Sequence, residues 1–572
     1  MAKSLEQLVI ATRPGEPKAL DLDSLTDRGM ELALIALAAM VAAALIASLV
    51  QLFNLAWSAP LLGLPAALVV LALSPVISIA AAGAFVLAAL IAGRWQRAEA
   101  QRGGVEAERG RARRGLRALT FGARERRRWR TAWVRDGRLA LGETRGGQVT
   151  TVPFGWRDGV RAFIPGAPGS GKTVDLALHA RAYIAHGQGV VAIDPKGDEA
   201  LRAELESAAG QGGRRFVEWT PTGLTTYNPL ARGNPSEITD KALAGEDWSE
   251  PHYLRQAQRY INAELQAMRA AGEWPASLRS LVHYLDPERL DALCDRLDGE
   301  LGERTAAYVD SLSQRQRADL GGVRDRLAVL AESELGVQLN PRGEDHQLDL
   351  LAALSAGDVV YFCLDSDRYA LASQMLGAAI ISDLVSLTGE LQGRPVRALV
   401  LIDEFAAVAA EEVSRLLSRS RSAGLSVVLA TQAFADLSIA RAGDGTDSLR
   451  RQVLSHIDYV VAHRQSEPEA AELLGQMAGT KPAWAVAISA NPKPFWERSA
   501  FDFGREGQTR RRTREFVRHP DEFKRLRRGE AIVIEPAGRE AADLVRIWPL
   551  AQRLSGSSAN ATAALATRGQ DL

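Results

Sequence analysis

The sequence predicts an α/β protein in which a mainly parallel sheet, covered by helices on both faces, carries a phosphate-binding loop. It also predicts an inserted all-α domain and an N-terminal transmembrane helical hairpin. Three observations lead to this prediction. No charged residue occurs between Leu32 and Gly93, the octet Gly-Ala-Pro-Gly-Ser-Gly-Lys-Thr occupies positions 166–173, and apolar runs alternate with helical segments on both sides of a helix-rich stretch at 236–345.

Length and composition indicate a multidomain protein without a disulfide or zinc framework. The chain has 572 residues, for which about two to four domains are expected. The formal net charge is zero, and the two cysteines, Cys294 and Cys363, have no Cys or His nearby at metal-ligand spacing. We expect them to be reduced thiols of a cytosolic domain, which excludes the class of disulfide-rich secreted proteins.

The uncharged stretch is long enough for two membrane spans. A hydrocarbon core about 30 Å thick needs roughly 20 helical residues, so we expect a first span at about Leu32–Phe53 and a second that ends near Gly93. Pro75 leaves the second half open, because it can kink one long helix or separate two short ones. Two spans are favoured, and three stay open. The polar residues before Leu32 exclude a signal peptide.

A dense arginine block follows the uncharged stretch. Its members are Arg94, Arg97, Arg102, Arg109, Arg111, Arg113, Arg114, Arg117, Arg124, Arg126, Arg127, Arg128 and Arg130. Because such clusters stay on the cytoplasmic side, the domain that follows is predicted to be cytoplasmic, and with two spans the N-terminus is cytoplasmic too. The block contacts either anionic lipid headgroups or nucleic-acid phosphate, and lipid is the safer interpretation.

The octet stands where a P-loop requires it. Val160–Ile164 is an apolar run typical of a strand, and Val174–His186 has a helical composition, so the loop joins a strand to a helix. Lys172 is expected to reach the β- and γ-phosphates of ATP, and the Thr173 hydroxyl to ligate Mg²⁺. The predicted nucleotide-binding residues are Gly166, Ala167, Pro168, Gly169, Ser170, Gly171, Lys172 and Thr173.

A P-loop needs an acidic partner after a buried strand, and two places compete for this role. Asp194 ends an apolar run soon after the octet but is followed by Pro-Lys-Gly, whereas Asp403 ends a longer apolar run and is followed directly by Glu404. Asp403 can hold Mg²⁺ while Glu404 polarises the attacking water as general base. The sequence therefore favours Asp403 and Glu404.

Two further features follow the acidic pair. Leu425–Ala430 is another apolar strand, which leads to Gln432, a residue placed to sense the γ-phosphate. The helical segment before it carries Arg415, Arg419 and Arg421. An arginine there either reaches the phosphate of a neighbouring subunit or lies on an exposed basic helix face. Further strands are predicted at Asp358–Leu364, Tyr459–His463 and Glu530–Glu535, whereas 466–528 is predicted as loops and short helices.

These features divide the chain into seven regions. They are a cytoplasmic N-terminal segment (1–30), a transmembrane hairpin of two spans (31–93), a basic membrane-proximal linker (94–145), the first part of the nucleotide-binding domain (146–235), the inserted all-α domain (236–345), the second part of the nucleotide-binding domain (346–552) and a disordered tail (553–572).

Taken together, the motifs resemble those of the TraD/TraG-like coupling proteins of type IV secretion and conjugation. The octet looks like their Walker A motif, Asp194-Pro-Lys-Gly197 is similar to their Asp-x-Lys-Gly signature, and Leu401-Ile-Asp-Glu-Phe405 looks like their Walker B motif. Gly357–Asp365 resembles the strand that precedes Walker B. Ser418–Gly424 with Ala430–Gln432 resembles the segment that carries their trans-acting arginine and sensor glutamine, which points to Arg421 and Gln432 as catalytic residues.

This resemblance covers roughly residues 30–550 and implies a RecA-like P-loop NTPase. It implies a DNA-stimulated ATPase of the bacterial inner membrane, multi-pass and homohexameric, with Mg²⁺ as cofactor. The cargo is single-stranded DNA bound to a relaxase, or a protein, passed to type IV secretion channel components; the sequence does not choose between them. Two alternatives are a double-stranded DNA translocase of the FtsK kind and a membrane docking platform that binds nucleotide without hydrolysis. Glu404 argues against the platform.

Overall fold

The computed structural model describes residues 22–52, 75–101, 126, 128–129, 132, 134–145, 147–244, 248, 250–340, 347–394, 396–405, 410–432, 434, 448–488, 508–535 and 542–549. The chain divides into two units. One comprises Met1–Gly115 and Ala483–Thr513, and the other comprises Leu116–Pro482 and Arg514–Leu572. The predicted tail after residue 553 and the first 21 residues lie outside the described residues.

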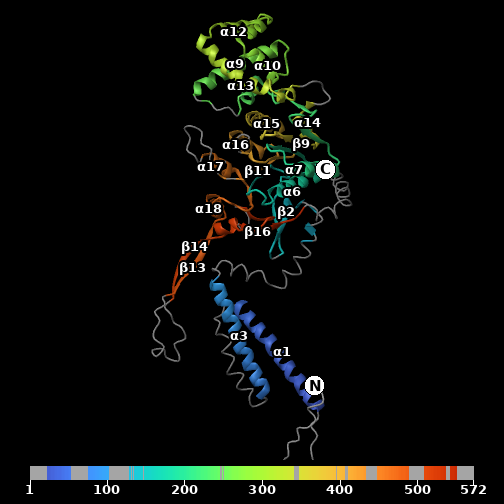
Figure 1. Cartoon of the computed structure of the whole chain (residues 1–572), viewed down its shortest axis with the longest axis vertical. Coiled ribbons are helices and arrows are strands. Elements are labelled where there is room, and N and C mark those ends of the chain that lie inside the picture. The colour runs from blue at the N-terminus through green and yellow to red at the C-terminus, as the bar shows by residue number, and fades with distance from the viewer. Residues whose placement is uncertain are drawn as a thin grey trace, which may run out of the picture. The chain divides into compact units, whose positions relative to one another are not determined.

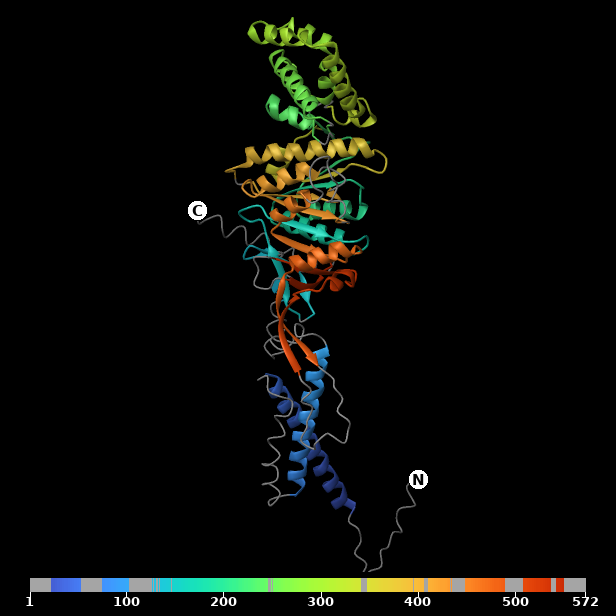
Figure 2. The ribbon, with the colours of Figure 1, turned by 90° about the vertical axis from the view of Figure 1, so that its left-hand side faces the viewer.

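The first unit contains a pair of apolar helices, α1 (Leu22–Leu52) and α3 (Pro75–Gln101), which run alongside each other (Figures 1 and 2). Their contact is made by small side chains, because the buried residues are Ala43, Ala47, Ala84, Ala88 and Ala92. Small residues let helix backbones approach closely, as in pairs of membrane helices. Ile46 and Ile91 pack against these alanines and are partly buried. Many of the larger apolar side chains of both helices are exposed, namely Leu34, Leu37, Met40, Val41, Leu45, Leu49, Ile79, Val86, Leu87 and Leu90.

By length and hydropathy, one described helix is suited to cross a membrane, and it is not one of this pair. That helix is α15 (Ala370–Leu391), of which 67% of the apolar window is buried inside the protein, as in the core helix of a soluble domain. The apolar parts of α1 and α3, Leu34–Leu49 and Ile79–Ala92, are shorter. The two-span hairpin therefore stays a prediction. Pro75 begins α3, in keeping with the preference of proline for the first helical turn. Residues 53–74 lie outside the described part of the chain, so the separation of two short helices at Pro75 stays a prediction.

A two-stranded ribbon lies in the region that was predicted as loops and short helices. It consists of β13 (Thr480–Ile488) and β14 (Gln508–Phe516). Arg514 of β14 donates hydrogen bonds to the side chain and the backbone oxygen of Thr480, at 2.8 and 3.1 Å. The prediction was wrong here because β14 is rich in arginine and lacks the apolar alternation by which a strand is recognised in a sequence.

The second unit is built on a sheet of 12 described strands, in the order β1-β2-β16-β15-β12-β4-β11-β10-β5-β9-β6, with β3 paired to β2. The parallel part contains β4 (Arg161–Pro165), β5 (Gly189–Asp194), β6 (Phe216–Trp219), β9 (Val359–Cys363), β10 (Ala398–Ile402), β11 (Leu425–Thr431) and β12 (Tyr459–Ala462). The antiparallel part contains β1 (Val134–Arg135), β2 (Arg138–Thr144), β3 (Val149–Pro153), β15 (Glu530–Ile534) and β16 (Ala542–Ile547).

The sheet is thus mixed: most of its described strands are parallel, as the sequence indicated, and an antiparallel part that was not predicted adjoins them. The antiparallel strands come from two distant parts of the chain, because β16 pairs with β2 and β15 pairs with β12. β1 and β2 lie within 94–145, for which a linker was predicted, so the sheet starts earlier in the chain than the composition suggested. These short strands were not predicted because arginine-rich segments precede them in the sequence.

Helices cover both faces of the parallel part, because successive residues of a strand point to opposite faces. Val190 and Ala192 of β5 belong to one core with α6 (Lys172–Ala185) and α7 (Glu199–Gln211). Val191 and Ile193 belong to the other core with α15 and α16 (Ala410–Ser420). The other described helices of this domain are α14 (Leu350–Ala356), α17 (Ser448–His456), α18 (Pro468–Met477) and α19 (Pro520–Lys524).

A helical region is inserted between two short strands, β7 (Thr226–Tyr227) and β8 (Gln347–Leu348), which pair in parallel at its base. It consists of α8 (Pro235–Ala242), α9 (Pro251–Ala270), α10 (Leu278–Tyr284), α11 (Pro287–Cys294), α12 (Glu300–Asp310), α13 (Gln314–Ala331) and a 3₁₀ turn, Glu334–Val337. Figure 2 shows α15, in yellow, between these green helices and the sheet.

A buried ionic cluster joins this inserted region to α15. The Lys241 ammonium lies 2.5 Å from Oδ1 of Asp383, and the Tyr227 hydroxyl donates to Oδ2 of the same carboxylate at 2.7 Å. The Lys241 side chain is fully buried. Removal of one partner from such a pair leaves an uncompensated buried charge, so the cluster fixes the base of the insertion.

Candidate functional site

The P-loop connects β4 to α6, and it forms backbone hydrogen bonds with two segments that are distant in the sequence. The backbone N–H of Ala167 donates to the carbonyl oxygen of Arg464 at 2.9 Å, and that of Gly529 donates to the carbonyl oxygen of Ser170 at 3.0 Å. Gly169 and Gly171 have positive φ angles of 69° and 114°, as the predicted loop conformation requires. The loop therefore has a fixed shape set by the ends of β12 and β15.

Lys172 meets both predicted acids. Its ammonium nitrogen lies 2.5 Å from Oε1 of Glu404 and 3.1 Å from Oδ1 of Asp403. The lysine and glutamate side chains are 9% exposed and the aspartate side chain 12%. Burial raises the pKa of Asp403, and the Lys172 charge opposes this rise. A cation and two carboxylates thus lie in contact with little exposure, at the end of a strand.

The register of the sheet explains why these residues meet. Ile402, the last residue of β10, pairs with Ile193 of β5 on one side and Leu429 of β11 on the other. Thr431 of β11 in turn pairs with Pro165 of β4, the residue before the P-loop. The carboxyl ends of the parallel strands therefore meet at one edge, which is where ligands bind in open α/β sheets.

Glu404 is held in a particular orientation. Its φ angle is 43°, in the left-handed region that costs a residue with a side chain about 1 kcal/mol or more. Its backbone N–H donates to Oδ1 of Asp403 at 3.0 Å, and its Oε2 accepts from the backbone N–H of Gln432 at 3.3 Å. Gln432, predicted as the sensor, is thus placed beside the predicted general base.

Arg421 lies at the opposite edge of the sheet. It precedes β11, which has 7 residues, so at about 3.3 Å per residue it is roughly 20 Å from the edge that bears the P-loop. Its carbonyl oxygen accepts from the N–H of Gly159, just before β4, at 3.0 Å. The side chain is exposed. Arg421 therefore does not join Lys172, Asp403 and Glu404 of its own chain.

Asp194, the alternative acidic candidate, has its carboxylate fully engaged in a turn. Oδ1 accepts from the backbone N–H groups of Lys196 and Gly197, both at 2.9 Å. Oδ2 accepts from the N–H of Asp198 at 2.6 Å and from the Tyr361 hydroxyl at 2.8 Å. This arrangement suits a turn-forming role and not a metal ligand.

A buried cluster of charged and titratable side chains, for which no role was predicted, lies beneath the P-loop. Nε2 of His463 lies 3.5 Å from Oδ2 of Asp175, and Nδ1 of His179 lies 3.4 Å from Oδ1 of the same carboxylate. A Cβ at Gly166 would lie 2.7 Å from Cβ of His463, so this ring packs directly under the loop. Burial would raise the pKa of Asp175, but the two histidines lower it to about 2.

The residues present fit a magnesium ion bound together with phosphate. Within the described part of the chain, no group of three or more His, Cys, Asp and Glu side chains could hold a metal by itself. Mg²⁺ usually takes one or two protein oxygens and completes its shell with water and phosphate. The Thr173 hydroxyl and the Asp403 carboxylate are such oxygens, both at the carboxyl edge of the sheet.

Comparison with known proteins gives one family match and several similar structures. The family model described as the TraM recognition site of TraD and TraG matches residues 397–528. The bacterial conjugative coupling protein TrwBdeltaN70, in its unbound monoclinic form, is 18% identical, with a TM-score of 0.54 over 75% of this chain and 91% of that one. No curated protein sequence matches.

Two other solved structures are less similar. The plasmid coupling protein TrwB in complex with the non-hydrolysable GTP analogue GDPNP is 19% identical, with a TM-score of 0.49 over 68% of this chain and 85% of that one. VirB4 of Thermoanaerobacter pseudethanolicus is 14% identical, with a TM-score of 0.47 over 74% of this chain and all (100%) of that one. The likeness to TrwBdeltaN70 shows a shared RecA-like α/β fold with a mixed sheet.

Proposed function

The chain is TraD/TraG-like in its family match and in its fold, and on that premise we propose that it is a membrane-anchored ATPase that couples substrates to a type IV secretion or conjugation channel. The observation that carries the proposal is the contact of Lys172, at the start of α6, with Asp403 and Glu404, directly after β10. ATP hydrolysis requires a lysine that binds phosphate, an aspartate that holds the metal ion and a glutamate that activates the attacking water.

Each residue has a distinct part in this mechanism. Lys172 binds the β- and γ-phosphates, while the N-terminus of α6 adds backbone N–H groups and a partial positive charge. Thr173 and Asp403 would hold Mg²⁺, which neutralises charge on the phosphate oxygens when it is bound. Glu404 accepts the proton of the attacking water. The N–H of Gln432 keeps the Glu404 carboxylate in place.

Arg421 supports a site shared between subunits. Its exposed side chain lies at the edge of the sheet opposite to its own P-loop, so within one subunit it has no access to the bound phosphate. In a ring, the amino edge of one subunit can face the carboxyl edge of the next. We assign Arg421 to the neighbour's γ-phosphate, in a homohexamer.

The helix pair α1 and α3 supports a membrane anchor. Leu34, Leu45 and Leu90 are 61%, 61% and 59% exposed, and the buried cluster between the helices consists of alanines where their side chains are described. Exposed leucines on both helices are costly in water and favourable in lipid. We propose that the pair spans the bacterial inner membrane twice, with the ATPase domain in the cytoplasm.

The proposal is tested by comparing DNA substrates on the full chain in lipid nanodiscs. A coupling protein for relaxase-bound strands is expected to hydrolyse ATP with Mg²⁺ and to be stimulated more by single-stranded than by duplex DNA. Stronger stimulation by duplex DNA would favour a translocase of the FtsK kind. Binding of ATP with no turnover under any of these conditions would favour the docking platform and contradict the proposal.

A further inference from the structure

We infer that Asp198 is a positioning residue for the Thr173 hydroxyl. We further infer that the Asp194-Pro-Lys-Gly197 turn holds the Asp198 carboxylate in the orientation that this role requires. The inference rests on the proposed function, because it concerns Mg²⁺ bound with nucleotide. The Thr173 Oγ1 donates a hydrogen bond to Oδ2 of Asp198 at 3.0 Å. No role in the nucleotide site was assigned to Asp198 from the sequence.

The direction of this hydrogen bond suits a metal ligand. A threonine hydroxyl has one proton and two lone pairs. When the proton is donated to a carboxylate, the lone pairs are free to face a cation and the oxygen becomes more electron-rich. Metal ligands are commonly oriented and made more basic in this way by an outer carboxylate. Asp198 is therefore placed to orient the Thr173 oxygen without itself touching the metal.

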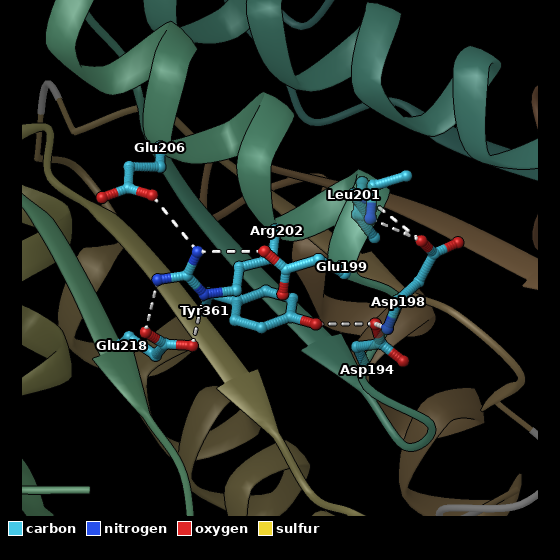
Figure 3. Close-up of polar contacts among 9 residues, drawn as sticks. Asp194, Asp198, Glu199, Leu201, Arg202, Glu206, Glu218 and Tyr361 are labelled. Carbon is cyan, nitrogen blue, oxygen red and sulfur yellow. Dashed lines mark hydrogen bonds and ion pairs between the residues drawn. The ribbon is translucent and has the colours of Figure 1, made fainter.

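Asp198 is held by contacts that leave Oδ2 for Thr173. Its Oδ1 accepts from the backbone N–H groups of Ala200 and Leu201, at 2.8 and 3.3 Å, and so caps the N-terminus of α7. Its own N–H donates to Asp194 at 2.6 Å. Figure 3 shows Asp198 between Asp194 on one side and the first turn of α7 on the other.

The turn before Asp198 is anchored to the neighbouring strand. The Tyr361 hydroxyl of β9 donates to Asp194 at 2.8 Å, as drawn in Figure 3, and Tyr361 is 1% exposed. Burial and the adjacent Asp194 carboxylate raise the pKa of Tyr361, which keeps its hydroxyl a donor. Four hydrogen-bond donors thus hold the Asp194 carboxylate. Because one of these donors is the backbone N–H of Asp198, the position of Asp198 is fixed as well.

Gly197 is needed for the turn to close. Its φ angle is 77°, and a Cβ at this position would lie 2.8 Å from Sγ of Cys363. A side chain there would displace the turn from β9 and move Asp198 away from Thr173. The turn from Asp194 to Asp198 is therefore fixed relative to two core strands, β5 and β9. Through Asp198, the same turn fixes the hydroxyl of Thr173, the last residue of the P-loop.

The test separates the helix cap from the contact with Thr173. Asp198→Ser keeps an oxygen that can cap α7, but this side chain is too short to replace both carboxylate oxygens. Asp198→Asn keeps one acceptor oxygen for the cap of α7 but replaces the other oxygen by an NH₂ group, which cannot accept the proton of Thr173. Glu199→Gln is the matched control, because Glu199 is 80% exposed and contacts only Arg202 among the described residues.

Binding of fluorescent ADP to the full chain is measured at increasing Mg²⁺ and in EDTA, together with the melting temperature. We expect Asp198→Ser to raise the Mg²⁺ concentration at half-saturation by about 10-fold or more. Asp198→Asn should raise it by a similar factor, because its NH₂ group cannot accept the Thr173 proton, and Glu199→Gln should leave it unchanged. Affinity in EDTA and the melting temperature should stay close to those of the wild type for the serine variant.

Two outcomes would overturn the inference. The first is a wild-type Mg²⁺ midpoint in both Asp198 variants, and the second is a lower midpoint, which would mean that Asp198 competes with the metal for Thr173. If Asp198→Ser does not fold, Asp198→Asn decides alone. Failure of the wild-type chain to bind ADP more tightly with Mg²⁺ would instead contradict the proposed function, so the two failures are distinguishable.

Discussion

The ammonium nitrogen of Lys172 lies 2.5 Å from Oε1 of Glu404, although the two residues are 232 positions apart in the chain. Both side chains are 9% exposed, so their interaction is poorly screened by water. The contact joins the first residue of α6 to the turn after β10. Because the same ammonium group is assigned to phosphate, substitution at Lys172 must affect both the stability of the fold and the binding of nucleotide.

Lys172→Ala should abolish ATP binding and also lower the melting temperature. Removal of the cation leaves Asp403 and Glu404 together without a countercharge, and breaking a buried pair typically costs roughly 3–5 kcal/mol. Calorimetry and fluorescent nucleotide titration measure the two effects. Lys196→Ala, at an exposed lysine near the same edge, is the control and should change neither.

A second variant separates these two effects. Lys172→Met combined with Glu404→Gln removes charge from both partners, so it should recover part of the lost melting temperature but none of the nucleotide binding. Unchanged nucleotide affinity in Lys172→Ala would show that the octet is not a phosphate site.

Arg421→Ala should reduce ATP hydrolysis by about 10³-fold or more in the assembled ring, the range found for arginines that act on a neighbour's phosphate. Nucleotide binding should be retained. Arg415→Ala, at another exposed arginine of the same segment, is the matched control. Mixed rings of Arg421→Ala with Lys172→Ala subunits should recover some activity, because some interfaces then contain one intact half from each chain. Absence of any recovery would exclude the shared site.

Glu264→Gln should stabilise the inserted helices only above about pH 4.5, where the carboxyl group ionises in the unfolded chain. Glu264 is fully buried, its carboxyl oxygens have no hydrogen-bond partner among the described residues, and burial raises its pKa well above the ordinary 4.5. Because the pKa of Glu264 is higher in the folded than in the unfolded chain, its contribution to the free energy of unfolding is fully present below pH 4.5. This contribution is lost as the pH rises through the pKa of the folded state. The variant removes this loss.

Thermal melting at two pH values checks this expectation. The melting temperature of Glu264→Gln should equal that of the wild type near pH 4 and exceed it near pH 8. Glu332→Gln, at an exposed position after α13, should behave like the wild type at both values. A difference of the same size at both pH values would mean that ionisation of Glu264 is not involved.

Leu45→Arg should weaken the association of the chain with membranes. Leu45 is 61% exposed on α1, and an arginine near the centre of a membrane helix costs roughly 2.5–3.5 kcal/mol on insertion scales. Alkaline carbonate extraction of cell membranes measures the retained fraction. Leu224→Arg, at a leucine that is 82% exposed in the ATPase domain, is the control. Equal retention of both variants would argue against a membrane position for α1.

Much of the fold core was predictable because its signals are local. The octet follows a short apolar strand, and the strand before Asp403 and Glu404 is an uninterrupted apolar run, so both could be placed from nearby residues alone. Their proximity followed from the rule that parallel strands end at one edge. The distances show that Lys172 contacts both Asp403 and Glu404, whereas the catalytic roles of these residues stay predictions.

Other features depend on pairings that a single sequence does not reveal. The antiparallel part of the sheet is formed by strands from both ends of the ATPase domain, so no local period indicates it. The contact of His463 with Asp175 and that of Thr173 with Asp198 arise only when distant segments meet. The position of Asp198 directly after the Asp-Pro-Lys-Gly signature, at the start of a helix, was a usable signal for the second of these contacts.

Hydrolysis by Glu404→Gln tests the central claim most directly. The full chain and this variant are compared for ATP bound at saturation and for phosphate released at steady state, with the exposed Glu469→Gln as control. We predict unchanged binding and a loss of turnover of about 10²-fold or more, because the general base is removed while the phosphate site remains. Turnover equal to that of the wild type would contradict the account.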